Sequence, residues 1–168
     1  MKKVTMWVEG VMPLLIHRPL ESDLVGSHRT NTVSEAPDPR EVANAHVYRL
    51  DNDQLAFPGQ AFLRLASEAG SSYKAKGSRK SLKYMVPGAM FIVDDLCPIF
   101  ENDRKTPITD FEVDSRPVTI PSTKGKVMRY RARLNKWSIP VNLRINETVI
   151  EEKIIRQLMT DGGQMIGI

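Results

Sequence analysis

A strand pattern changes into a helix pattern within ten residues, LAFPGQAFLR, at positions 55–64. The run from Leu55 to Phe57 is short and apolar, and Pro58-Gly59 follows it directly. Proline is tolerated in the first turn of a helix, where no backbone donor is needed, so we expect Pro58-Gly59 to open a helix that ends at Gly70. Its apolar stripe would consist of Ala61, Phe62, Leu65, Ala66 and Ala69.

The sequence before this segment predicts a hairpin, a strand and a long loop. Residues 47–50 and 54–57 are β-prone and flank the turn formers Asp51-Asn52-Asp53, which is typical of a β-hairpin. A first strand is predicted from Lys3 to Glu9. Between the strand and the hairpin, prolines and polar residues without periodicity predict a loop insertion over residues 18–46.

The sequence after this segment predicts strands and a second helix. Strands are expected over residues 89–93, 127–134 and 139–145, and the polar, turn-rich stretch 101–126 is expected to form a hairpin-like excursion. Residues 149–159 have a wide apolar face at helical spacing. Thr148 and Glu151 have capping-box spacing, and Asp161-Gly162-Gly163 is expected to end this helix.

This order of elements predicts a single α+β domain over residues 1–168. It is typical of a split βαβ, or ferredoxin-like, topology with one antiparallel sheet, two main helices and the two insertions, 18–46 and 101–126. The strand that would complete this topology is missing, and it would pair beside Val4 to Val8. Because an open edge favours pairing with other chains, we expect a homo-oligomer or a subunit of a larger complex.

Composition excludes several classes of protein. No apolar run is long enough for a transmembrane helix, so no membrane partner is expected. A single cysteine, Cys97, and the lack of a zinc-like Cys/His spacing predict a cytoplasmic protein without a structural metal. The net charge of +4 is only mildly basic, so any argument for nucleic acid depends on how the charges are distributed.

One basic segment follows the first predicted helix, at residues 73–84. It has no acid, and tyrosines flank it. Such a segment suits phosphate contacts, and a solubilising loop is the alternative interpretation. Its candidate phosphate contacts are Lys74, Lys76, Arg79, Lys80 and Lys83.

A second basic segment covers residues 124–137. Three arginines alternate along a predicted strand and would share one face, with about 7 Å between neighbours, which is close to the spacing of phosphates in an extended single strand. The alternative is an edge strand that charge protects from aggregation. The candidate contacts are Lys124, Lys126, Arg129, Arg131 and Arg133, with Tyr130 and Trp137 for stacking on bases.

The sequence does not predict an enzyme or a cofactor. It contains no P-loop, no dinucleotide fingerprint and no nucleophile elbow. Its three histidines, His17, His28 and His46, have no partner that the sequence identifies, so no catalytic residue and no metal ligand is assigned.

Two motifs resemble the RAMP superfamily. Residues 55–64 look like its strand-turn-helix signature, and residues 161–168 look like the start of its glycine-rich loop. The sequence departs from the family at Leu63-Arg64, where Lys-Gly is common, and the loop stops before its usual arginine. The resemblance implies an RRM-like fold and a role beside RNA, as in the backbone subunits of CRISPR effector complexes in antiviral defence.

We therefore expect a binding subunit that holds single-stranded nucleic acid, RNA rather than DNA, in a multi-copy assembly. A RAMP-type endoribonuclease is the first alternative, with His17 or His28 as proton donor or with Asp23 or Asp38 positioning the attacking hydroxyl. A phage protein that binds single-stranded DNA is the second. The third is an assembly protein whose basic face pairs with the acids between Asp94 and Asp114 of another copy.

Overall fold

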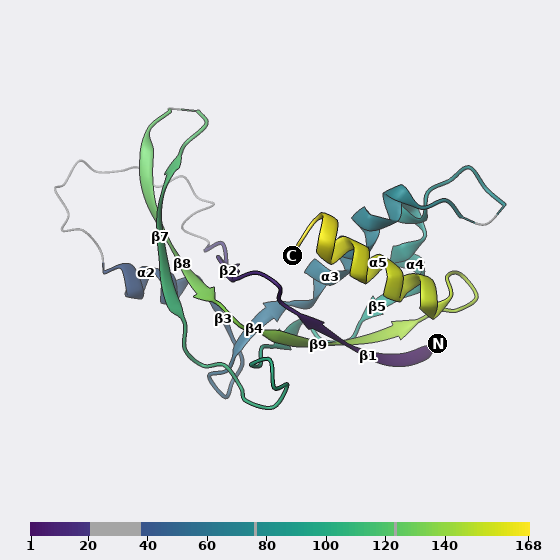
Figure 1. The fold of residues 1–168 in the computed structure, drawn as a ribbon, viewed down its shortest axis with the longest axis horizontal. Coiled ribbons are helices and arrows are strands. Elements are labelled where there is room, and N and C mark those ends of the chain that lie inside the picture. The colour runs from purple at the N-terminus through teal and green to yellow at the C-terminus, as the bar shows by residue number, and fades with distance from the viewer. Residues whose placement is uncertain (21–37, 76, 123) are drawn as a thin grey trace. The chain divides into compact units, whose positions relative to one another are not determined.

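The computed structural model describes residues 1–20, 38–75, 77–122 and 124–168 (Figure 1). The chain forms two compact units, and each unit is built from separate stretches of sequence. Unit 1 comprises residues 1–8, 58–97 and 139–168, and unit 2 comprises residues 9–57 and 98–138. The described parts of both predicted insertions fall in unit 2.

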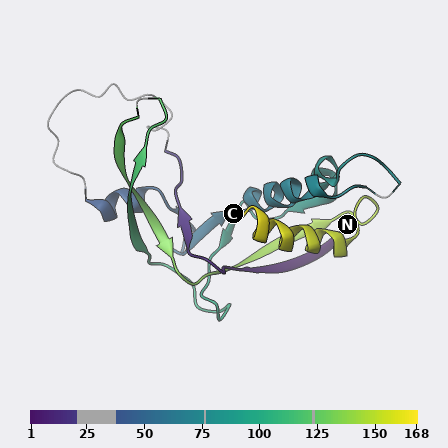
Figure 2. The same cartoon turned by 45° about the horizontal axis from the view of Figure 1, so that its top comes forward.

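Unit 1 is a small sheet covered by two helices. Strands β1 (Lys2–Glu9), β9 (Ser138–Ile145) and β5 (Met90–Ile92) form the sheet in the order β1-β9-β5. Helices α3 (Gly59–Ala69) and α5 (Glu152–Met165) lie side by side on one face of it (Figures 1 and 2). The short helix α4 (Val86–Ala89) precedes β5. The alternating pattern of β9 is confirmed, because Val141, Leu143 and Ile145 are all buried.

The two helices approach each other closely at a glycine. A Cβ atom built on Gly162 would lie 2.8 Å from Cγ of Leu65, so only glycine fits there without a shift of α3. The prediction that Asp161-Gly162-Gly163 ends the last helix is therefore wrong, since α5 continues to Met165. The capping box is also wrong: the Thr148 hydroxyl bonds to Asn146, and α5 has no side-chain cap.

Unit 2 contains a long hairpin. Strands β2 (Leu14–Ile16), β8 (Lys126–Leu134) and β7 (Glu112–Thr119) form a sheet in the order β2-β8-β7. Helix α2 (Pro39–Ala45) packs against β8. In Figures 1 and 2, the far end of β7 and β8 projects beyond α2.

The last sheet has the order β3-β4-β6 and contains the predicted hairpin. Its strands are β3 (Tyr48–Arg49), β4 (Leu55–Pro58) and β6 (Leu96–Pro98). Tyr48 pairs with Ala56, and Asp53 adopts a left-handed φ of 66° in the turn, which confirms this hairpin.

The predicted single ferredoxin-like sheet is wrong. The described strands form three small sheets within a mixed α+β fold, instead of one split βαβ sheet. The cause is visible at residues 135–137, which separate β8 from β9, because these two neighbouring strands join different sheets. The alternation of apolar and polar residues predicts which face of a strand is buried, but it does not predict which strand is its partner.

Two local predictions in the insertions are also wrong. The stretch 101–126 is not a hairpin of its own. Residues 101–106 form a local turn, in which the Glu101 N–H bonds to the Thr106 carbonyl, and β7 is one continuous strand that pairs with β8 along its length. The predicted loop 18–46 contains helix α2, and residues 21–37 of that loop lie outside the described residues. Asp38 caps α2, since its side chain accepts a 2.7 Å bond from the backbone N–H of Arg40, and Pro39 occupies the first turn.

Three structural checks bear on general function. No helix in the described ranges is long and apolar enough to cross a membrane. Cys97 is a buried free thiol, and burial raises its pKa to about 11, so it is a poor nucleophile at neutral pH. Among the residues described, no group of three or more His, Cys, Asp or Glu side chains is arranged to hold a metal ion.

Candidate nucleic-acid interface

In the β7–β8 hairpin, the predicted basic strand β8 pairs with β7. The first residues of β7 include the acids Glu112 and Asp114, and Arg116 follows them. The register runs from Glu112 opposite Arg133 to Thr119 opposite Lys126. Residues directly opposite in an antiparallel pair project from the same face. The three predicted arginines of β8 therefore share a face with Glu112, Asp114 and Arg116 of β7. Lys126 projects from the other face, together with Met128 and Tyr130.

At the base of the hairpin, acids compensate the arginines. We define the base as residues 112–115 and 130–134. Arg133 lies opposite Glu112, and Asn135 links them by accepting a 2.9 Å bond from Nε of Arg133 and donating a 2.8 Å bond to Glu112. Asp114 lies opposite Arg131 and is only 7% exposed. An anion at the base would therefore meet carboxylates as well as guanidinium groups.

The pair of Asp114 and Arg131 is incompletely bonded. Oδ1 of Asp114 accepts a 2.9 Å bond from Nε of Arg116, which lies two residues along β7. Oδ2 of Asp114 and Nε of Arg131 are both buried, and neither has a hydrogen-bond partner among the described residues. The register nevertheless places the Asp114 carboxyl group opposite Arg131, so an acid and a guanidinium group lie at the same level of the hairpin.

The other face of the base belongs to the core of unit 2. Ala132 is fully buried and Leu134 is 4% exposed, and both pair with β2. Helix α2 covers this part of β8. The base of the hairpin is thus held by apolar packing on one face, and on the other by the Asn135 hydrogen bonds and the ion pair of Asp114 with Arg116.

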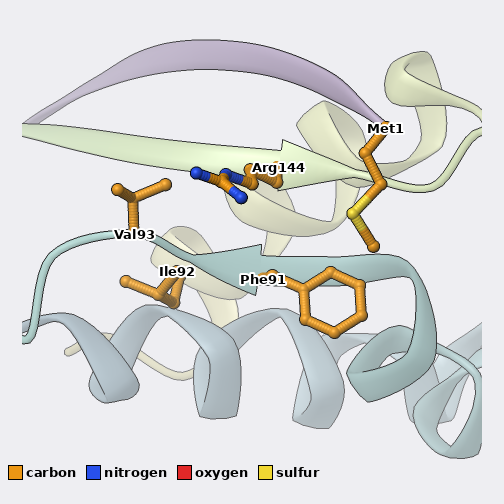
Figure 3. Close-up of a pocket in the computed structure, with 5 residues that line it drawn as sticks. All are labelled: Met1, Phe91, Ile92, Val93 and Arg144. Atoms are coloured by element: carbon orange, nitrogen blue, oxygen red, sulfur yellow. The ribbon is translucent and has the colours of Figure 1, made fainter.

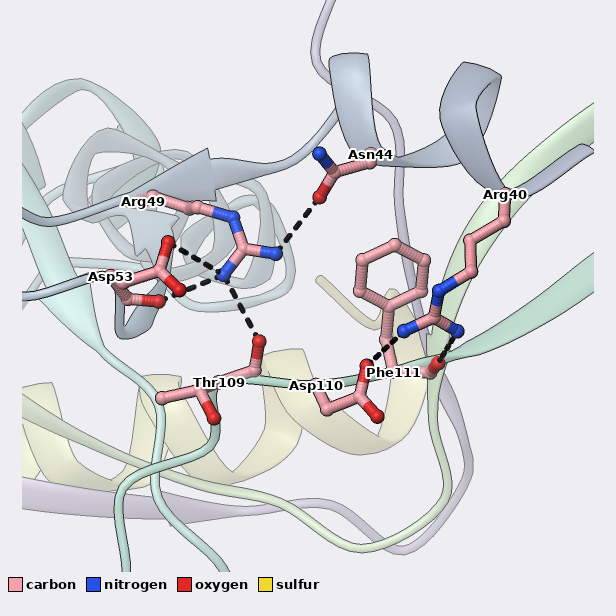
Figure 4. A network of polar contacts seen from close by, with 7 residues as sticks. All are labelled: Arg40, Asn44, Arg49, Asp53, Thr109, Asp110 and Phe111. Atoms are coloured by element: carbon pink, nitrogen blue, oxygen red, sulfur yellow. Dashed lines mark hydrogen bonds and ion pairs between the residues drawn. The ribbon is translucent and has the colours of Figure 1, made fainter. Parts of the chain in front are cut away.

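Polar contacts connect α2 to the start of β7, as Figure 4 shows. The Arg40 guanidinium lies 5.0 Å from the ring centroid of Phe111, donates to the Phe111 carbonyl and pairs with Asp110. The backbone N–H of Phe111 and the Arg40 side chain lower the pKa of Asp110. Arg49 donates to the carbonyl oxygens of Asp53 and Thr109. These contacts fix the direction in which the hairpin leaves the core.

At the tip of the hairpin, Arg116 pairs with Asp114 of the base, and the other cations that the structure describes have no ion pair. We define the tip as residues 116–129, without residue 123. The sequence contains no Asp or Glu from Ser115 to Leu134. Lys124, Lys126 and Arg129 are exposed, and no ion pair to any of them exists within the described residues.

Arg129 has a like charge directly across the sheet. Its partner in the register is Arg116. Nη2 of Arg116 forms a 2.8 Å ion pair with Oδ1 of Asp114. Two cations opposite each other destabilise a hairpin unless an anion lies between them. Arg116 was not among the residues predicted from sequence. The signal that could have identified it is the absence of acid over Ser115 to Leu134, since Arg116 falls within that stretch.

The two aromatic candidates differ in availability. Tyr130 is half-buried on the Lys126 face of β8. Trp137 is 6% exposed, its Nε1 donates a 2.9 Å bond to the Met12 carbonyl, and its ring lies where a side chain on Gly10 would be. The placement of Trp137 does not fit the expected role in stacking, because its ring is packed in the core of unit 2.

The first basic segment lies in unit 1 as a turn that closes on itself. The backbone N–H of Ala75 bonds to the Lys80 carbonyl, and Gly77 adopts a φ of 71°. Lys74, Arg79 and Lys80 are exposed, whereas Lys76 lies outside the described residues. Lys83 bonds to Glu68 through contacts of 2.8 and 2.9 Å, which lower the pKa of Glu68. Lys83 is thus already paired with an acid.

The residues of the endoribonuclease alternative do not converge in the described parts of the chain. His17 stacks on buried His46 with 4.3 Å between ring centroids, and Nδ1 of His46 lies 2.7 Å from the Arg18 carbonyl. Asp38 is occupied as the cap of α2. His28 and Asp23 lie outside the described residues. The stacked histidines are therefore interpreted as part of the packing of unit 2.

Comparisons of the chain with protein-family models, with curated proteins and with solved structures gave no match. The resemblance to the RAMP superfamily thus stays a prediction from the two motifs. One of those motifs has an unexpected conformation, because residues 161–165 are helical instead of forming a loop.

Proposed function

We propose that this protein binds single-stranded nucleic acid, RNA by preference, through the tip of the β7–β8 hairpin. The observation that carries the proposal is the charge of the tip: Lys124, Lys126 and Arg129 are exposed on a stretch that contains no acid. Phosphate contacts of this kind supply most of the sequence-independent affinity for nucleic acid. The preference for RNA comes from the resemblance of residues 55–64 to RAMP proteins.

The shape of the hairpin supports a single strand as the ligand. Two paired strands form a ribbon with cations on both faces, Arg129 on one and Lys126 on the other. A flexible single strand can follow such a ribbon and contact both faces, whereas a rigid duplex presents its phosphates to one side. Half-buried Tyr130 lies on the Lys126 face, where its ring could contribute to base stacking.

Charge protection of an edge strand is the competing interpretation, and the pairing limits it. At its base, β8 is the middle strand of the sheet, because β2 covers Ala132 to Leu134. Only the part of β8 beyond β2 has an edge that needs protection, and one or two charges suffice for that purpose.

Membership of a multi-copy assembly is part of the proposal. Strand β1 stands at one end of the order β1-β9-β5, so a strand from another chain could pair with it. Light scattering at several protein concentrations tests this part separately, and a strict monomer, with or without RNA, would contradict it.

The proposed function is tested with a charge-matched pair of variants. Lys126→Gln with Arg129→Gln removes two tip cations, and Lys105→Gln with Lys153→Gln removes two exposed cations elsewhere. We expect the tip variant to bind a fluorescent single-stranded RNA about tenfold more weakly at low salt. The control variant should bind like the wild type.

Three outcomes of this experiment are informative. Equal losses in both variants would show that only net charge matters, and the tip would lose its role. Stronger binding to DNA of the same sequence would assign the ligand to DNA. No binding of any strand at low ionic strength would overturn the proposal and favour the assembly protein.

A further inference from the structure

The sheet of unit 1 has an outward face that no part of the proposed interface uses. Helices α3 and α5 both pack against the opposite face, where Val141, Leu143 and Ile145 are buried. Alternate residues of each strand project outward. On the three strands these outward residues are Lys3, Thr5 and Trp7 of β1, Asn142 and Arg144 of β9, and Phe91 with the following Val93 at β5.

An aromatic ring and a guanidinium group are neighbours on this face. Phe91 and Arg144 are directly opposite in the antiparallel register of β5 and β9. Phe91 is 39% exposed and Val93 is 49% exposed, so both apolar side chains are open to a ligand. A shallow depression of about 330 Å³ is lined by these residues and by Met1, whose side chain lies nearest the Phe91 ring in Figure 3. An exposed ring is a surface on which a nucleobase can stack, and the Arg144 guanidinium, which points toward Val93 in Figure 3, supplies positive charge on the same face.

A second depression extends the first toward β1. It measures about 280 Å³ and is lined by Lys3, Thr5, Val93, Asn142 and Arg144, among others. Because Arg144 and Val93 line both depressions, the two form one continuous track across the strands.

The polar groups of the track provide positive charge and hydrogen bonding. Lys3 and Arg144 are exposed cations, and no ion pair to either is found in the part of the chain that the structure describes. The Thr5 hydroxyl donates a 2.7 Å bond to Asn142, which donates a 2.8 Å bond to Asp94. Asp94 is therefore hydrogen-bonded at one end of the row Thr5–Asn142–Asp94, and Lys3 and Arg144 can each contact a phosphate.

We propose that this outward face is a second binding site, which stacks a base of single-stranded nucleic acid on Phe91 while Arg144 and Lys3 hold the adjacent phosphates. Charge complementarity favours this ligand over a protein partner, because the exposed cations Lys3 and Arg144 suit phosphates and lysine is depleted at protein interfaces. This site would bind the same class of ligand as the hairpin tip, so the inference rests on the proposed function. Because the site lies in unit 1 and depends on stacking, experiments can contradict either proposal without contradicting the other.

The test compares two substitutions of one ring. Phe91→Leu keeps the apolar volume and removes the aromatic face, and Phe91→Tyr keeps the face. We expect Phe91→Leu to weaken binding of a single-stranded RNA about fivefold or more, the loss of one base–aromatic stack, and Phe91→Tyr to bind like the wild type. Thermal melting of each variant confirms that it is folded.

Photocrosslinking supplies a readout that a merely structural role of Phe91 would not produce. An RNA with 5-iodouridine at alternate positions is irradiated in complex with the full chain, and crosslinked peptides are identified by mass spectrometry. We expect a crosslink to Phe91 or to a residue of the track. Crosslinks confined to the hairpin would overturn the inference and leave the proposed function intact.

The remaining outcomes separate the two sites. Normal affinity of Phe91→Leu, with weak binding by the tip variant, would overturn this inference alone. Weak binding by Phe91→Leu with normal binding by the tip variant would overturn the proposed function and retain the sheet face. If Phe91→Leu turned a self-associating wild type into a monomer without changing RNA affinity, the face would be a protein interface and the inference would be wrong.

Discussion

The base and the tip of the β7–β8 hairpin carry the same kinds of residue in different surroundings. Arg133 and Arg129 project from one face of one strand, four residues apart. Glu112 lies opposite Arg133, whereas Arg116 lies opposite Arg129. The strand partner, and not the arginine spacing, therefore decides where an anion is needed. A row of alternating arginines is best judged together with the strand that it pairs with.

The largest expected effect concerns stability. Leu134→Ala at the base should cost about 2–5 kcal/mol, because it opens a cavity at a side chain that is 4% exposed. Met128→Ala at the tip should cost less than about 0.5 kcal/mol, since Met128 is 50% exposed. Urea denaturation of the two variants measures both values. Similar costs would contradict the division of the hairpin into a packed base and a solvent-exposed tip.

A smaller effect is expected when the base is made to resemble the tip. Glu112→Gln removes the acid opposite Arg133, so RNA affinity should rise about two- to threefold at low salt. Glu101→Gln is the matched control, because Glu101 is an exposed acid of unit 2 outside the hairpin. An equal rise in both variants would show that the local pairing has no influence.

The smallest effect is a dependence of stability on pH at the start of β7. The Phe111 N–H and Arg40 lower the pKa of Asp110 below its usual 3.8. A group whose pKa is lowered by folding stabilises the fold above its usual pKa, and this contribution is lost as the pH falls through the folded value. Between pH 7 and pH 3, Asp110→Asn should therefore lose less melting temperature than the wild type. An equal loss would show that the Arg40 contact does not stabilise unit 2.

Sequence patterns identified the elements whose secondary structure is determined by neighbouring residues in the chain. The hairpin around Asp53, helix α3 and strand β9 were predicted because turn chemistry, Pro58-Gly59 and clean alternation each act within a few residues. Strand pairing was not predictable in this way. β7 was not predicted as one strand, because residues 114–117 are polar or proline and interrupt its apolar positions. Its pairing with β8, across the connection 120–125, makes it one continuous strand.

The errors at the helix ends have local causes as well. Gly162 was taken as a helix terminator, but its lack of a side chain serves the close contact with Leu65 of α3. Helix α2 was missed because it is short, although Asp38-Pro39 is a usual start. For the candidate site, the cations of β8 were predicted, whereas the acids opposite two of them, Glu112 and Asp114, came from the pairing with β7. Phe91 and Arg144 were missed because they are neighbours only across β5 and β9.

The most direct test of the tip as the phosphate-binding surface is the salt dependence of RNA binding. Each phosphate contact on a single strand contributes about −0.7 to the slope of log affinity against log salt. The slope of Lys126→Gln with Arg129→Gln should therefore be shallower than that of the wild type by about 1.4. Lys105→Gln with Lys153→Gln should keep the wild-type slope. A tip variant whose slope equals that of the wild type would contradict the account, because the phosphates would then be bound elsewhere on the protein.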